Sequence, residues 1–158
     1  MGQMGVQSAP VRARTIGRHH GVKRGEKAWA DKAFEALVHA PNAAAAGVRK
    51  TVAEQLFRKL ASKTEMATGK LRAQLIPDST WKRAGEVLGP SASQTVSRLA
   101  NALFVAERVW QSEPDAIGFL LRPHVELGQV SPYSLLNTES GGRTVENLLA
   151  ALEFGFPV

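Results

Sequence analysis

Apolar residues recur every three or four positions along most of this chain, which is the spacing of α-helices. The longest such run extends from Ser91 to Gln111, and we predict that this helix is the spine of the fold. Its stripe is wide enough to favour a homodimer in which the helix packs against its copy, although a well-buried helix of a monomer gives the same pattern. The stripe consists of Val96, Leu99, Ala100, Leu103, Ala106 and Trp110, widened by Phe104 and Val105.

Shorter helical patterns precede the spine. Thr51–Ala61 places its apolar residues on one face, and a weaker pattern covers Glu65–Ala73 before Pro77 interrupts it. Asp78 or Ser79 is expected to cap a third, short helix. Three short helices in succession, the last one starting at a cap, are typical of a helix-turn-helix.

The third short helix presents Ser79, Thr80, Lys82 and Arg83 on its polar face. The second helix of a helix-turn-helix lies in the major groove with its first residues at base edges, so we predict that these four side chains contact DNA. In the alternative interpretation, Trp81 anchors the helix in the core, and Lys82 and Arg83 are merely solvated.

The beginning of the chain lacks this periodicity. Residues 1–25 are interpreted as a disordered basic arm, and residues 26–47 as an N-terminal helix followed by a linker. The helix should cover Glu26–Ala40 and stop at Pro41. The four alanines within Pro41–Gly47 favour a helix by propensity, but the flanking Pro and Gly favour a linker, which we expect.

After the spine, Ser112 and Pro114 are expected to start a helix over Asp115–Leu121. Ser131 followed by Pro132 is typical of an N-cap with proline at the first helical position, and it predicts one or two helical turns.

A last helix is predicted from the apolar face formed by Val145 and three leucines that follow it. Gly141 and Gly142 are expected to allow close packing or a bend. Gly155 should end the helix, because glycine enters the left-handed conformation without a side-chain penalty, and Pro157 cannot continue it.

Several of these segments together resemble the toxin-binding domain of the Xre/MbcA/ParS antitoxins, which are the partners of RES-domain toxins. The resemblance extends over roughly Thr51–Val158, and one departure is that family members have a Gly-Gly-Arg-Thr-Pro type turn where this chain has Gly-Gln-Val-Ser-Pro. The segments are Arg122-Pro123-His124, Leu127-Gly128-Gln129-Val130-Ser131-Pro132, Glu139 to Leu149, and Gly155. The segment Asp78-Ser79-Thr80-Trp81-Lys82-Arg83 is similar to the family's recognition helix, with Lys82 in place of one arginine.

The resemblance implies an all-α fold, with an Xre-like helix-turn-helix bundle followed by a small helical C-terminal toxin-binding domain. The helix-turn-helix domain with its long dimerisation helix would cover residues 48–111, and the toxin-binding domain would cover residues 112–158. It further implies that the C-terminal domain binds a RES-type toxin, an NAD-consuming enzyme, and blocks its active site. The helix-turn-helix would bind the operator of the shared operon.

A cleft that accepts an anionic dinucleotide is concave and rich in polar donors, so a narrow tail with carboxylates and aromatic rings would fill it. In the alternative, the two aromatic rings fold back to complete this protein's own core. We assign this plug to Glu153, Phe154, Phe156, Pro157 and Val158, with Arg143 and Glu146 as flanking contacts.

Charge is distributed unevenly along the chain. Residues 1–90 hold 16 Lys and Arg against 7 Asp and Glu, whereas residues 91–158 hold 4 against 7. A basic half is the electrostatic footprint of phosphate contact, because binding releases condensed counterions. The alternative is a solvated basic arm that has no partner.

Composition excludes several classes of protein. With no cysteine, the chain forms neither a disulfide nor a thiolate metal site, which suits a reducing cytoplasm. No stretch reaches the roughly 18 consecutive apolar residues of a membrane span, and the N-terminus lacks the apolar core of a secretory signal. We therefore expect a cytoplasmic protein without membrane contact.

The sequence offers no candidate catalytic residue, metal site or cofactor motif. The histidines have no ligand at a suitable helical spacing, and the chain contains neither a phosphate-binding Gly-x-x-x-x-Gly-Lys run nor a Gly-x-Ser-x-Gly elbow. A different class of function remains open. The chain would then be a stand-alone helix-turn-helix transcriptional regulator whose C-terminal domain dimerises or senses a ligand.

Overall fold

The computed structural model describes residues 32, 35–38 and 43–155, and in this part of the chain the secondary structure is helical, without a β-strand. The expected all-α fold is therefore confirmed. The elements are α2 (Ala43–Ala46), α3 (Lys50–Ala61), α4 (Thr68–Leu75), α5 (Asp78–Arg83), α6 (Pro90–Trp110), α7 (Glu113–Leu121), the 3₁₀ turn η1 (Val125–Leu127), α8 (Pro132–Leu135) and α9 (Glu139–Phe154).

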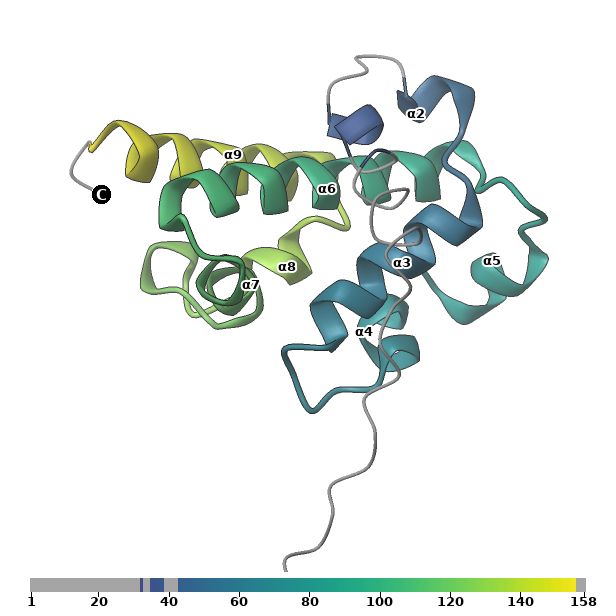
Figure 1. Cartoon of the computed structure of the whole chain (residues 1–158), viewed down its shortest axis with the longest axis horizontal. Helices are drawn as coiled ribbons and strands as arrows, with labels where there is room; N and C mark the ends of the chain where they lie inside the picture. Colours follow the sequence, from purple (N-terminus) through teal and green to yellow (C-terminus); the bar gives the residue numbers. More distant parts are fainter. Residues whose placement is uncertain (1–31, 33–34, 39–42, 156–158) are drawn as a thin grey trace, which may run out of the picture.

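Helix α6 is the spine, as its stripe predicts. It has 21 residues, which corresponds to about 31 Å at 1.5 Å per residue. In Figure 1, α9 lies beside α6. Helices α7 and α8 lie below the C-terminal half of α6, and α3, α4 and α5 lie around the N-terminal half of α6. The stripe residues Val96, Leu99, Ala100, Leu103 and Ala106 are buried, whereas Trp110 and the widening residues Phe104 and Val105 are partly buried.

Helices α6 and α9 run parallel. Near their middle, Asn101 Nδ2 donates a hydrogen bond to Glu146 Oε1 at 3.4 Å, and at their C-terminal ends Arg108 forms an ion pair with Glu153. The residue number rises along both helices from one contact to the next. The two C-terminal ends therefore lie at the same end of the molecule.

The expected close packing at Gly141 and Gly142 is confirmed. A Cβ on Gly141 would lie 2.1 Å from the carbonyl oxygen of Leu135, and one on Gly142 would lie 2.6 Å from Arg98 Cδ. Arg98 Nε in turn donates to the carbonyl oxygen of Leu136 at 3.0 Å. The Leu135 carbonyl is part of the backbone and cannot move aside, so only glycine at position 141 lets the first turn of α9 approach α8 this closely.

The two halves of the chain share one core. Tyr133 of α8 is buried, and its hydroxyl donates to the carbonyl oxygen of Leu71 in α4 at 2.7 Å. Lys59 of α3 pairs with Glu107 of α6 at 2.7 Å and with Glu113 of α7 at 3.3 Å. A division into residues 48–111 and 112–158 therefore cuts through packed contacts and stays a prediction about function.

Two details of the sequence analysis are wrong. Residues 43–46 form α2 and not a linker, because four consecutive alanines have the highest helix propensity and α2 also packs against α6. Neither Asp78 nor Ser79 caps α5, since the N-cap is Pro77 and no side chain accepts a cap hydrogen bond. Asp78 instead forms an ion pair with Arg72 at the end of α4.

The caps at Ser112 and Ser131 and the stop at Gly155 are confirmed. The helix expected over Glu65–Ala73 instead covers Thr68–Leu75, and the expected stop at Pro41 lies outside the described residues. The Ser112 hydroxyl accepts from the Asp115 N–H, and the Ser131 hydroxyl accepts from the Ser134 N–H, as N-caps do. Gly155 ends α9 with a φ of 69°. The predicted N-terminal helix is described only at residues 32 and 35–38, which are helical, and the predicted arm lies outside the described residues. No helix in the described ranges is long and apolar enough to span a membrane.

Candidate functional site

The residues predicted to contact DNA lie on a short helix at one end of the molecule. Ser79, Lys82 and Arg83 of α5 are exposed, whereas Thr80 is half-buried. Arg83 Nε donates to the Ser79 carbonyl oxygen at 3.2 Å, so its guanidinium lies along its own helix. Three of the four predicted side chains are therefore accessible to a partner.

Trp81 holds this helix against the rest of the protein. Its ring meets the ring of Phe57 edge to face, with the centroids 6.3 Å apart. The cationic groups of Lys50 and Arg72 lie 5.1 Å and 4.8 Å from the Trp81 ring centroid, within the range of cation–π contacts. The interpretation of Trp81 as an anchor is thus confirmed, and it fixes α5 without using Lys82 or Arg83.

The predicted plug begins at the free end of α9. Phe154 is 71% exposed, so its ring does not fold back into the core of the described structure. Gly155 follows it in the left-handed conformation and ends the helix. The remaining plug residues, Phe156, Pro157 and Val158, lie outside the described residues.

The charged residues assigned to the same surface already have partners within the chain. Arg143 pairs with Glu139 one helical turn earlier at 2.6 Å, and both side chains are exposed. Glu153 is largely buried in its ion pair with Arg108. An exposed pair contributes little to stability, about 0–1 kcal/mol, so Arg143 can exchange its partner at small cost. Glu153 is less free than the sequence analysis expects.

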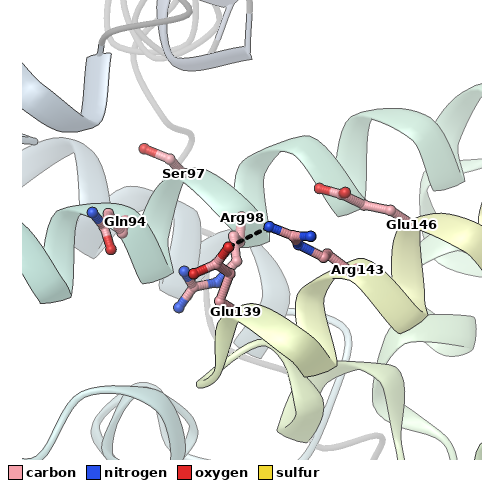
Figure 2. A pocket seen from close by; sticks show the side chains of 6 residues that line it. All are labelled: Gln94, Ser97, Arg98, Glu139, Arg143 and Glu146. Carbon is pink, nitrogen blue, oxygen red and sulfur yellow. Dashed lines mark hydrogen bonds and ion pairs between the residues drawn. The ribbon is translucent and has the colours of Figure 1, made fainter.

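Arg143 and Glu146 line a shallow cavity of about 410 Å³ between α6 and α9. Figure 2 shows Arg143 pointing toward Glu139, with Glu146 further along α9 and Arg98, Ser97 and Gln94 on the facing helix. The Ser97 hydroxyl is buried there and has no hydrogen-bond partner among the described residues. Since Arg143 and Phe154 are 11 positions apart on α9, they are separated by about 16 Å along its axis. The predicted residues therefore form two patches and not one.

A second cavity was not predicted from the sequence. This aromatic pocket of about 320 Å³ lies at the C-terminal end of α6 and is lined by Trp110, Pro114, Asp115, Gly118, Phe119 and residues 122–124. The rings of Trp110 and Phe119 are stacked with centroids 4.4 Å apart, and the ring of His124 meets Phe119 edge to face at 5.5 Å. The signal in the sequence is that Trp110 lies at the end of one predicted helix, and Phe119 and His124 lie close to the end of the next.

A compact loop adjoins the aromatic pocket. The His124 N–H donates to the Val130 carbonyl oxygen at 3.2 Å, and the Gln129 N–H donates to the His124 carbonyl oxygen at 2.9 Å. These bonds close the loop, which exposes Val125 at 73% and Val130 at 39%. The backbone of His124 thus organises the loop, while its imidazole Nδ1 is buried and makes no hydrogen bond within the described part of the chain.

The described residues contain no group of three or more side chains placed to hold a metal ion. The polar side chains that gather in the C-terminal half line the shallow cavity between α6 and α9. Its most distinctive features are exposed apolar side chains and an aromatic pocket, which are the means of binding a macromolecule.

One segment of this chain is similar to a known protein family. Residues 105–155 match the model of the antitoxin Xre/MbcA/ParS C-terminal toxin-binding domain. The match covers 51 of the 158 residues and supports an antitoxin role, in agreement with the resemblance seen in the sequence. It encloses α7, α8 and α9, the aromatic pocket and Phe154. No curated protein matches the chain.

Proposed function

We propose that this protein is a cytoplasmic antitoxin that neutralises a RES-domain, NAD-consuming toxin by inserting the end of α9 into its active-site cleft. The observation that carries the proposal is the position of Phe154, which is 71% exposed at the free end of a helix within the matched toxin-binding domain. Burying such an exposed ring against a partner removes a large apolar area from water.

The geometry near Phe154 supports a protruding contact. The ion pair of Glu153 with Arg108 holds α9 against α6 up to its last turn, and Gly155 then ends the helix. A rigid helix end that presents an aromatic anchor loses little conformational entropy on binding. We assign Phe154, with Phe156, Pro157 and Val158 after it, to the cleft, and Arg143 and Glu146 to its margin.

We further propose that the protein binds the operator of its own operon as a homodimer. Ser79, Lys82 and Arg83 are exposed on α5, and Trp81 fixes that helix to the core. The net charge of residues 1–90 is +9. A recognition helix presents exposed cationic side chains to DNA phosphates and bases while its other face packs on the protein, and α5 has both features.

The test replaces Phe154 by alanine and measures NAD consumption by the purified toxin at increasing antitoxin concentration. Truncating an anchor side chain costs an interface roughly 2 kcal/mol or more, so the inhibition constant should rise about 30-fold. Met66→Ala is the matched control, because Met66 is also exposed but lies in the other half of the chain. Met66→Ala should inhibit like the wild type.

Thermal melts of both variants alone separate binding from folding. Full inhibition by Phe154→Ala would place the toxin contact elsewhere. If the wild-type protein binds operator DNA tightly and has no effect on the toxin, the chain is instead a stand-alone helix-turn-helix regulator whose C-terminal half dimerises or senses a ligand.

A further inference from the structure

The aromatic pocket lies on the opposite side of α6 from the contact between α6 and α9. Arg108 of α6 reaches Glu153 of α9, and Trp110 follows two positions later, which is about 200° around the helix. The Trp110 ring therefore points toward α7, where it stacks on Phe119. The pocket and Phe154 are at the same end of the molecule but on different faces, so one does not form part of the other.

Gly118 forms the floor of the pocket, and its identity is not explained by packing. A Cβ placed there would meet only Arg122 Cζ, at 3.8 Å, which is an ordinary contact. A glycine in the interior of a helix costs about 0.5–1 kcal/mol relative to alanine, and Gly118 lies in the middle of α7. The fold would therefore be more stable with a side chain here, and what the glycine provides is open space above the helix.

The walls and rim suit an aromatic side chain. The Trp110 and Phe119 rings supply a stacked apolar wall, and the exposed Arg122 lies over the floor, where its guanidinium can cover a ring that enters. Val125, which follows the lining residue His124 in the chain, is an exposed apolar side chain. Aromatic anchors that enter such pockets commonly dominate the binding energy of an interface.

We infer that the aromatic pocket receives an aromatic side chain of the toxin, which makes the antitoxin's contact surface bipartite. The inference rests on the proposed function. The occupant is assigned to the toxin because every residue that lines the pocket lies within the segment matching the toxin-binding domain. The toxin would then contact the antitoxin on two faces near the C-terminal end of α6. Phe154 would enter the toxin, and an aromatic ring of the toxin would enter the pocket.

Gly118→Leu places a branched side chain in the pocket, where it displaces only the exposed side chain of Arg122, whose Cζ lies 3.8 Å from the position of a Cβ. We expect its melting temperature to equal or exceed that of the wild type, because leucine has the higher helix propensity. Its affinity for the purified RES-domain toxin, measured by calorimetry, should fall at least about tenfold. The matched control is Gly69→Leu, which also adds a side chain to a helix, where a Cβ would find nothing within 4 Å. Gly69→Leu should bind the toxin like the wild type.

Arg122→Ala provides a second test if Gly118→Leu melts early, since Arg122 is exposed and its loss should also weaken binding. Unchanged affinity in both variants overturns the inference, whereas failure of the wild-type protein to bind toxin overturns the proposed function itself. Light scattering tests whether the pocket joins two copies of this chain: in that case, free Gly118→Leu would have half the mass of the wild type.

A truncation tests whether the pocket holds the chain's own tail. In that case, deleting residues 156–158 would tighten toxin binding in the wild type but not in Gly118→Leu. Either result overturns the inference.

Discussion

Replacing Tyr133 by phenylalanine should destabilise the protein at neutral pH and stabilise it at high pH. The Tyr133 side chain is 1% exposed and its hydroxyl donates to the Leu71 carbonyl oxygen at 2.7 Å. A buried hydrogen bond contributes about 1 kcal/mol net to the free energy of unfolding, which the substitution removes. At pH 7 the variant should therefore be less stable by about that amount.

The pH dependence follows from burial. Burial raises the pKa of the Tyr133 phenol above its ordinary value of 10.0, and the smaller effect of Arg72 acts in the opposite direction. Because the folded-state pKa is raised, the stabilisation is fully present below pH 10 and is lost as the pH rises toward the folded pKa. Each pH unit in that window costs the wild type about 1.4 kcal/mol. The variant should overtake the wild type between about pH 10.5 and 11.

The assay compares urea unfolding of the two proteins from pH 8 to pH 11, where other ionisable groups contribute equally to both. Tyr133 is the only tyrosine in the chain, so tyrosinate absorbance reports its ionisation directly. The native protein should show no tyrosinate band at pH 10, and unfolding should reveal one. A stability difference that stays constant with pH, or a tyrosinate band in the native protein at pH 10, would refute the reasoning.

Two further predictions concern other parts of the fold. For the double variant Lys82→Ala, Arg83→Ala, the slope of log affinity for operator DNA against log salt concentration should be smaller by about two units, because up to two fewer counterions are released. Gel-shift titrations at several salt concentrations measure this slope, and an unchanged slope contradicts the prediction. Gly141→Ala should lower the free energy of unfolding by about 3 kcal/mol or more, because its Cβ would lie 2.1 Å from the Leu135 carbonyl oxygen. In urea unfolding of both variants, Gly69→Ala should leave the free energy of unfolding unchanged or raise it slightly, because a Cβ at position 69 meets nothing within 4 Å.

The helices could be predicted because their signals are local. The stripe of α6 and the caps at Ser112 and Ser131 depend on residues within one or two turns, and the structure has them where the sequence places them. Competing local signals are harder to resolve. At residues 43–46 the helix propensity of the alanines favours a helix, whereas the flanking Pro41 and Gly47 disfavour one. The packing of α2 against α6 stabilises the helix.

The candidate site could be predicted only in part, because it depends on contacts between distant segments. The sequence indicates that Phe154 follows an apolar face and precedes a stop, which leaves its exposure open, and the structure resolves that question in favour of exposure. The engagement of Glu153 by Arg108 joins residues 45 positions apart and has no local signature. The aromatic pocket likewise needs the turn between α6 and α7 to bring Trp110 onto Phe119.

The parallel arrangement of α6 and α9 has an electrostatic consequence. Each helix carries a partial charge of about −0.5 at its C-terminal end, and parallel packing adds these two ends together beside Phe154. Residues 91–158 have a net charge of −3, which has the same sign as these helix ends. A cleft built to hold the phosphates of a dinucleotide is positive. The antitoxin's approach would then be steered end-on, and its association rate would fall as the ionic strength rises.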